Sequence, residues 1–171
     1  MQQSVTSILS NTELFDNLSP TQLELVASIC EAETYQTGDI LLEEQDCSDD
    51  MYVIARGTVE VIMNPAFVGE EINQAHIKPV ALTELRQGQV FGEVSLVDQG
   101  IRTASIRANQ KNTLLLRIPR DRIMLLCDTY PEFGYKLMKN IAADLAFKIR
   151  YTDLTIRQYQ LLLFQSKRNE P

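Results

Sequence analysis

Residues 91–106 read FGEVSLVDQGIRTASI, and they place a carboxylate, Glu93, nine positions before a guanidinium, Arg102. A carboxylate accepts hydrogen bonds, whereas a guanidinium donates them in a planar fork that fits a phosphate. A small ligand that carries a sugar hydroxyl and a charged phosphate needs one group of each kind. The spacing therefore predicts a site for such a ligand. The alternative is that Glu93 and Arg102 pair with each other and only close the fold.

Short apolar runs flank this stretch on both sides, between residues 34 and 119. They read TYQTGDILLEE, DMYVIARGTVEVIM, PVALTELRQGQVFGE, TASIRA and NTLLLRIP, and Gly38, Gly57 and Gly88 fall at the breaks. Short, regularly punctuated runs of this kind are typical of strands in a small barrel or sandwich. We therefore expect a mainly β fold in the middle of the chain.

Helical patterns enclose the predicted strands. Ser19 and Pro20 precede TQLELVASICEAE, as an N-cap and a first-turn proline precede a helix. After Pro119, RDRIMLLCDTY predicts a short helix, and residues 131–168 predict one long helix. We expect one domain over residues 1–130, with an N-terminal helical segment, followed by the long helix of residues 131–168.

An apolar stripe runs along the predicted long helix at steps of three or four. It consists of Leu137, Ile141, Leu145, Ile149, Thr152, Ile156, Tyr159 and Leu163. This stripe is longer than docking on a small barrel requires, so we expect part of it to pack against a second copy of the chain. The alternative is that the whole stripe folds back on its own domain.

Composition excludes several classes of function. The chain has 171 residues and a net charge of −7, which argues against general binding to nucleic acid or to anionic membranes. It contains neither a signal peptide pattern nor an apolar membrane span, so we expect a cytoplasmic protein. Cys30, Cys47 and Cys127 form no CxxC pair and His76 is the sole histidine, so we expect neither a metal site nor an enzyme.

The order of these segments resembles the cyclic-nucleotide-binding domain family, as in the sensory domains of cAMP receptor proteins and protein kinase regulatory subunits. The resemblance covers roughly residues 9–150 and is most specific at Phe91-Gly92-Glu93 and Arg102-Thr103-Ala104-Ser105. It implies a small double-stranded β-helix (jelly-roll) barrel, with N-terminal helices and a long C-terminal helix. It also implies that Glu93 accepts from a ribose 2′-hydroxyl and that Arg102 pairs with the cyclic phosphate. The implied ligand-binding residues are Phe91, Gly92, Glu93, Val94, Ser95, Arg102, Thr103 and Ala104.

The identity of the base depends on the long helix. Alignment of residues 130–132 with the start of the family's helix brings Lys148, Ile149 and Thr152 near the base. Lysine only donates, so Lys148 suits a guanine O6, whereas family frequency favours cAMP over cGMP. Thr103 fits either nucleotide.

We therefore predict a stand-alone regulatory module that binds cAMP or cGMP, holds no cofactor, and signals to an effector protein through movement of its C-terminal helix. The chain shows no DNA-reading segment after the long helix, so no DNA partner is expected. The second hypothesis is a dimerisation or scaffold protein that keeps the fold and binds no nucleotide.

Overall fold

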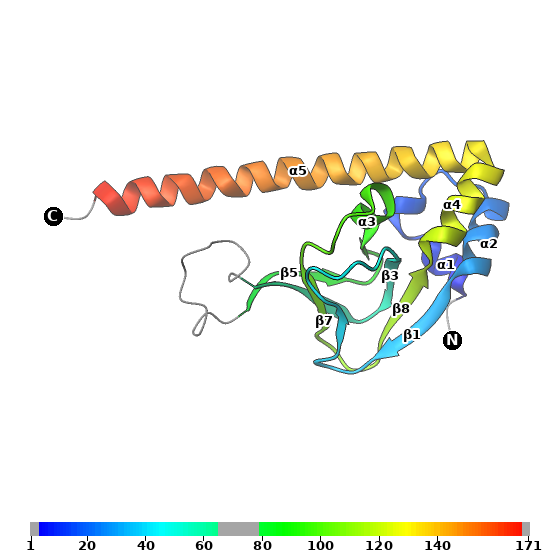
Figure 1. Ribbon diagram of the computed structural model, residues 1–171, viewed down its shortest axis with the longest axis horizontal. Helices are drawn as coiled ribbons and strands as arrows, with labels where there is room; N and C mark the ends of the chain where they lie inside the picture. Colours follow the sequence, from blue (N-terminus) through cyan, green and yellow to red (C-terminus); the bar gives the residue numbers. More distant parts are fainter. Residues whose placement is uncertain (1–3, 65–78, 169–171) are drawn as a thin grey trace.

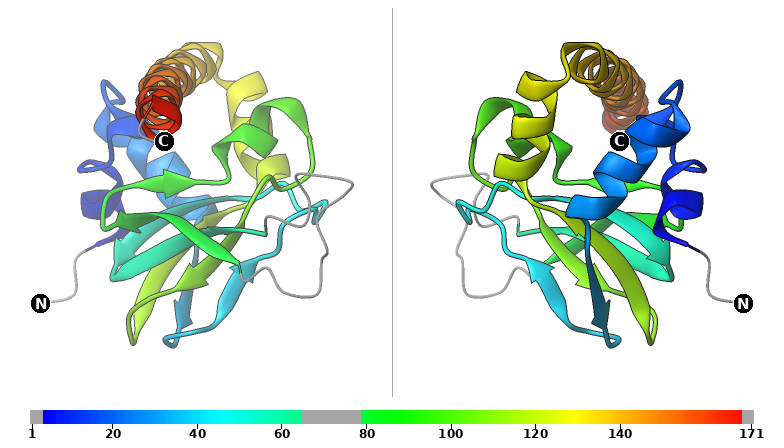
Figure 2. Two further views of the ribbon diagram at one scale, coloured as in Figure 1. Left: turned by 90° about the vertical axis from the view of Figure 1, so that its left-hand side faces the viewer. Right: turned by 90° about the vertical axis from the view of Figure 1, so that its right-hand side faces the viewer.

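Two antiparallel sheets form the body of the protein in the computed structural model, which describes residues 4–64 and 79–168. One sheet has the strand order β1-β8-β3-β6 and the other has the order β2-β7-β4-β5. Helices gather on one side of the strands (Figures 1 and 2). The predicted fold class, mainly β with flanking helices and a long C-terminal helix, is confirmed. The strands are β1 Glu31–Tyr35, β2 Ile40–Leu42, β3 Met51–Arg56, β4 Thr58–Met63, β5 Val80–Arg86, β6 Val90–Phe91, β7 Ser105–Ala108 and β8 Thr113–Ile118.

Strand β3 takes part in both hydrophobic cores. Met51 and Val53 belong to a cluster with residues of the helices, whereas Tyr52 and Ile54 belong to a second cluster with residues of both sheets. Successive side chains of a strand point to opposite faces, so one strand can serve two cores only if both of its faces are apolar. The sequence MYVIA supplies that run, and all five of these side chains are buried.

The N-terminal segment forms α1 Val5–Leu9, the short 3-10 helix η1 Glu13–Phe15 and α2 Pro20–Ile29. The Ser19 side chain accepts from the backbone N–H of Gln22, and the Gln22 side chain accepts from the backbone N–H of Ser19, which is a capping box. The sequence pattern predicts that this helix continues through residues 31–33, but α2 ends at Ile29 and β1 begins at Glu31. Every residue from Glu31 to Tyr35 pairs with β8, and this long-range pairing overrides the local preference.

Two helices follow the strands, α4 Arg120–Thr129 and α5 Pro131–Arg168. Helix α5 buries Phe133, Leu137 and Ile141 near its start and then extends past the rest of the molecule (Figure 1). No helix among residues 4–64 and 79–168 is long and apolar enough to cross a membrane. The predicted division into a domain of residues 1–130 and a helix of residues 131–168 stays a prediction.

Two of the predicted turn glycines differ in the space around them. Gly57 and Gly38 both have positive φ, +92° and +96°, but a Cβ on Gly57 would lie 2.5 Å from Oγ1 of Thr113, whereas a Cβ on Gly38 would meet nothing within 4 Å. Gly38→Ala should lower the free energy of unfolding by backbone strain alone, about 1–3 kcal/mol. Gly57→Ala should lower it further because it adds the clash. Urea unfolding of both variants measures this difference, and equal losses would contradict it.

Candidate functional site

A sharp turn at Gly92 connects β6 to the short helix α3 Glu93–Asp98. Gly92 has φ of +80°, and a Cβ there would lie 2.7 Å from the carbonyl oxygen of Asp50 and 2.9 Å from Nη1 of Arg102. Only glycine fits both this backbone conformation and this close approach. The turn thus brings the start of α3 and the Arg102 side chain together.

Arg102 is only 4% exposed, and its guanidinium donates to four oxygens, three of them in loops or turns and one in α3. Nε donates to Oγ of Ser48 at 3.1 Å, and Nη1 donates to Oγ of Ser95 at 3.1 Å and to the carbonyl of Gly92 at 3.3 Å. Nη2 donates to the carbonyl oxygen of Asp50 at 2.6 Å. All four acceptors are neutral, so they orient the cation without neutralising it.

The electrostatic surroundings of Arg102 are consistent with an anion-binding group. Burial lowers the pKa of Arg102 below its usual value, and the more distant charges, including those of Asp50 and Asp46, act against this shift. None of the ion pairs among the described residues involves Arg102. A buried, oriented guanidinium that contacts no carboxylate is suited to bidentate binding of a phosphate.

Glu93 is also buried, with 3% of the residue exposed, and it begins α3. Its Oε1 lies 2.7 Å from Nζ of Lys148, which comes from α5. The alternative that Glu93 and Arg102 pair with each other is therefore wrong, because the ion partner of Glu93 is Lys148. The site thus holds an oriented cation and a separate buried carboxylate, as a ligand with a phosphate and a hydroxyl requires.

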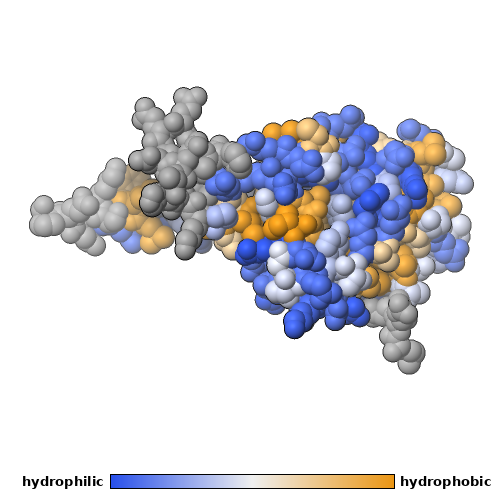
Figure 3. Space-filling model, turned by 60° about the horizontal axis from the view of Figure 1, so that its bottom comes forward, coloured by the Kyte–Doolittle hydropathy of each residue, from blue (hydrophilic) through white to orange (hydrophobic). Residues whose placement is uncertain are grey.

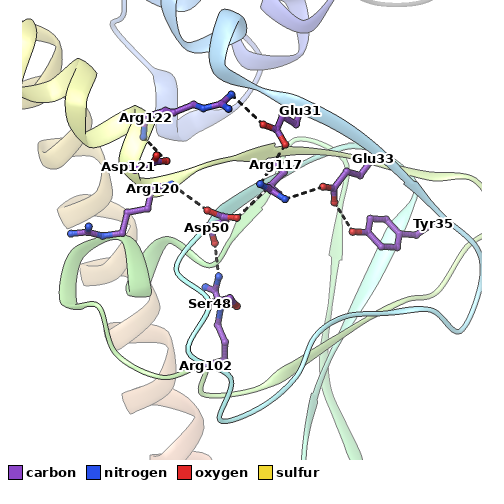
Figure 4. A network of polar contacts seen from close by, with 10 residues as sticks. All are labelled: Glu31, Glu33, Tyr35, Ser48, Asp50, Arg102, Arg117, Arg120, Asp121 and Arg122. Carbon is purple, nitrogen blue, oxygen red and sulfur yellow. Dashed lines mark hydrogen bonds and ion pairs between the residues drawn. The ribbon is translucent and has the colours of Figure 1, made fainter.

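Asp50 links this site to a wider polar network (Figure 4). Its carbonyl accepts from Arg102, while its carboxylate lies 3.1 Å from Nε of Arg117 and accepts from the backbone N–H of Arg120 at 3.3 Å. Arg117 also pairs with Glu31 and Glu33 of β1. The cation of the site is therefore connected through one residue to strand β8 and to the start of α4.

The sequence alone did not predict this network of Asp50 and Arg117. Asp50 directly precedes β3, and Arg117 lies near the end of β8. In the pairing of these two strands, Arg117 is the partner of Tyr52. The signal available in the sequence was the charge of Asp50 directly before an apolar strand, but its partners depend on the register of the sheet.

Comparison with known proteins identifies the family. The sequence model described as "Cyclic nucleotide-binding domain" matches residues 32–130, which include the whole site on α3 and the following loop. The chain belongs to the cyclic nucleotide-binding domain family. The predicted resemblance is thereby confirmed.

Named relatives include both regulators and kinases. The cyclic AMP receptor protein of Thermus thermophilus is 30% identical over 94% of this chain and 67% of its own length. The human cGMP-dependent protein kinase 2 is 25% identical over 81% of this chain but only 17% of its own length. The crystal structure of the Thermus thermophilus catabolite activator protein superposes with a TM-score of 0.71 at 28% identity, over 87% of this chain and 63% of that one. The chain thus spans about two thirds of the first relative and a small part of the kinase.

The structure of this family member brings together only some of the predicted ligand residues. Gly92 and Ser95 accept hydrogen bonds from Arg102, whereas the Glu93 side chain contacts Lys148. Phe91 lies in the core with its ring stacked on Tyr52 at a centroid distance of 5.1 Å. Outside this group, Val94 and Thr103 are exposed and Ala104 is half-buried. All eight residues stay predicted ligand contacts.

The three predicted base contacts lie on α5 in different surroundings. Lys148 contacts Glu93, Ile149 is 63% exposed, and the Thr152 hydroxyl donates to the carbonyl of Lys148 at 2.9 Å. Their role at the base stays a prediction. Among the residues that the structure describes, no group of three or more histidine, cysteine or acidic side chains is placed to hold a metal ion, and His76 lies outside them.

Proposed function

We propose that this chain is a regulatory module that binds a cyclic nucleotide, with cAMP favoured over cGMP. The observation that carries the proposal is the buried Arg102 guanidinium, which four neutral oxygens orient beside the separate carboxylate of Glu93. Arg102 binds the singly charged cyclic phosphate, and Glu93 accepts from the ribose 2′-hydroxyl. The module acts by binding and performs no catalysis of its own.

Family membership supports the ligand class, and the relatives favour one base. The relative that matches the larger share of its own length is named a cyclic AMP receptor protein, whereas the cGMP-dependent kinase matches over a small part of its length. We therefore place cAMP first. The stand-alone character of the module, its cytoplasmic location and the absence of a DNA partner stay predictions.

The proposed signal is a change in the position of α5 on ligand binding. Lys148 of α5 contacts Glu93 directly, and Asp50 connects Arg102 to the start of α4, which directly precedes α5. A ligand that binds Glu93 and Arg102 more tightly in one arrangement of these helices shifts the population toward that arrangement. An effector protein would recognise the new position of α5.

Isothermal titration calorimetry with cAMP and with cGMP tests the proposed function. Binding of either nucleotide supports a regulatory module, and tighter binding of cAMP supports the choice of base. If neither nucleotide releases or absorbs heat, and neither shifts the unfolding temperature, the second hypothesis of a non-binding scaffold replaces this one.

We also propose that α5 forms a homodimer with a second copy. Beyond residue 148, every described side chain of α5 except Thr155 is exposed. The predicted stripe includes Ile149, Ile156, Tyr159 and Leu163, which are 49–64% exposed. Figure 3 shows hydrophobic and hydrophilic residues side by side where α5 extends beyond the body. A second α5 would cover this apolar surface.

Ile156→Glu should convert the dimer to a monomer in sedimentation experiments, because it places a charge in the apolar stripe. Gln158→Glu is the matched control, since it adds the same charge two positions later, on a different face of α5. The control should stay dimeric. A wild-type protein that remains monomeric at high concentration would contradict dimerisation, as would a dimer that survives Ile156→Glu.

A further inference from the structure

The exposed half of α5 carries a second apolar stripe besides the one assigned to the homodimer. It consists of Phe147, Tyr151, Leu154 and Leu161, with Gln158 at the polar position between the last two. The four apolar side chains are 57–65% exposed. Their steps of four and three positions give the seven-residue repeat with which helices pack side by side in coiled coils. The second stripe is therefore suited to contact another helix.

The two stripes of α5 face nearly opposite directions. Members of the second stripe follow members of the first by two positions, as Tyr151 follows Ile149 and Gln158 follows Ile156. Two positions correspond to a rotation of roughly 200° around an α-helix. A second copy of α5 that packs on Ile149 and Ile156 therefore leaves the second stripe uncovered.

Two arginines border the second stripe on the same side. Arg150 and Arg157 directly precede Tyr151 and Gln158, and both arginines are exposed. Neither takes part in an ion pair among the residues that the structure describes. Asp153 is the single acidic residue within one turn of them, so one carboxylate stands against two guanidiniums. This border of the stripe is therefore positively charged.

We propose that the second stripe docks an amphipathic helix of a partner protein that carries acidic residues beside its apolar positions. The inference rests on the proposed function, and it specifies the chemistry of the effector protein. Residues that border the seam between two packed helices face each other and determine the choice of partner. Glutamates at these positions of the partner would meet Arg150 and Arg157.

Another α5 would fit the second stripe less well than an acidic helix. In an antiparallel pair, the borders that contain Arg150 and Arg157 would face each other, and like charges oppose such a contact. In a parallel pair, these arginines would face Thr155 and Leu162 of the other helix, which offer no carboxylate. The charge pattern therefore favours a different protein over a further copy of this chain.

Fluorescence anisotropy with a designed peptide tests the docking surface. The probe is a labelled helix of about three repeats, with isoleucine and leucine at the seam and glutamate at every bordering position, so that its like charges oppose pairing with itself. The matched probe has lysine in place of each glutamate. The wild-type chain should bind the acidic peptide roughly tenfold more tightly than the basic one. Equal affinities, or no binding of the acidic peptide, would overturn the proposal.

Variants of the two stripes locate the bound peptide. Leu154→Glu should weaken binding of the acidic peptide roughly tenfold, because it places a charge within the second stripe. Ile156→Glu is the matched control, since it adds the same charge on the opposite stripe and should change the affinity by about twofold or less. Loss of binding in Ile156→Glu would place the peptide on the homodimer stripe and overturn the proposal. Tyr151→Glu replaces Leu154→Glu if that variant does not fold.

Charge reversal tests the role of the two arginines. The double variant Arg150→Glu with Arg157→Glu should bind the basic peptide more tightly than the acidic one, which reverses the preference of the wild type. An unchanged preference for the acidic peptide would show that these arginines do not select the partner, and it would overturn the acidic chemistry proposed for it.

Sedimentation tests whether a further copy of the chain covers the second stripe. The wild type and Leu154→Glu should have the same oligomeric state. A larger wild-type assembly that Leu154→Glu reduces to a dimer would assign the stripe to this chain itself and overturn the proposal. None of these experiments depends on Arg102 or Glu93. If the chain binds neither cAMP nor cGMP, the proposed function fails, while the peptide experiments still decide the docking surface.

Discussion

Arg102→Ala is expected to weaken nucleotide binding strongly. Four oxygens orient the Arg102 guanidinium within the described site. Without this guanidinium, the cyclic phosphate would be an unpaired anion in a site that also contains the buried carboxylate of Glu93. Truncation of one partner of a buried charge pair costs about 2–5 kcal/mol. The dissociation constant should therefore rise roughly 30-fold to several thousand-fold.

Calorimetry measures this loss of affinity, and two further variants serve as controls for it. Arg107→Ala is the matched control, because Arg107 pairs with Glu60 at the surface and its side chain is 44% exposed. It should bind as the wild type does. Arg102→Lys keeps the charge but loses the planar fork, so its affinity should lie between those of the wild type and Arg102→Ala. An Arg102→Ala protein that unfolds normally and binds as tightly as the wild type would remove Arg102 from the phosphate site.

Phe133→Ala is expected to cause the largest loss of stability. Phe133 is 1% exposed and joins the start of α5 to the cluster that contains α1, α2 and β3. Removal of a buried phenylalanine ring typically lowers the free energy of unfolding by about 3–5 kcal/mol, because apolar burial is lost and a cavity remains. Such a loss is a large share of the stability of a single domain.

Urea unfolding compares this variant with Tyr135→Ala. Tyr135 lies two positions further along the same helix but is 68% exposed, so its removal should change stability by about 0.5 kcal/mol or less. Equal losses in the two variants would contradict the assignment of the start of α5 to the core.

Several elements were predictable because their signals are local. Ser19 and Pro20 predicted the start of α2, because its capping box involves only residues three positions apart. The apolar run at residues 51–55 predicted β3, since a strand that is buried on both faces requires such a run. The end of α2 was predicted too late, because only pairing with β8 reveals that residues 31–35 are a strand.

The site was predictable in part for the same reason. Gly92, Glu93 and Arg102 lie within eleven positions, and their chemistry alone pointed to a ligand with a hydroxyl and a phosphate. The partner of Glu93 was not predictable in the same way. Lys148 appeared as a donor toward the base, whereas the structure brings its ammonium to Glu93 across 55 positions of sequence.

The sequence by itself determined most of the strands and helices, the fold class, and which side chains within 91–106 suit a phosphate and a sugar. These properties follow from periodicity, capping and side-chain chemistry, which act over a few residues. The tertiary structure decided that Arg102 contacts only neutral oxygens, that Asp50 joins it to α4, and that Lys148 holds Glu93. Such pairings depend on sheet register and on the path of α5, and both are set by packing between segments that lie far apart in the chain.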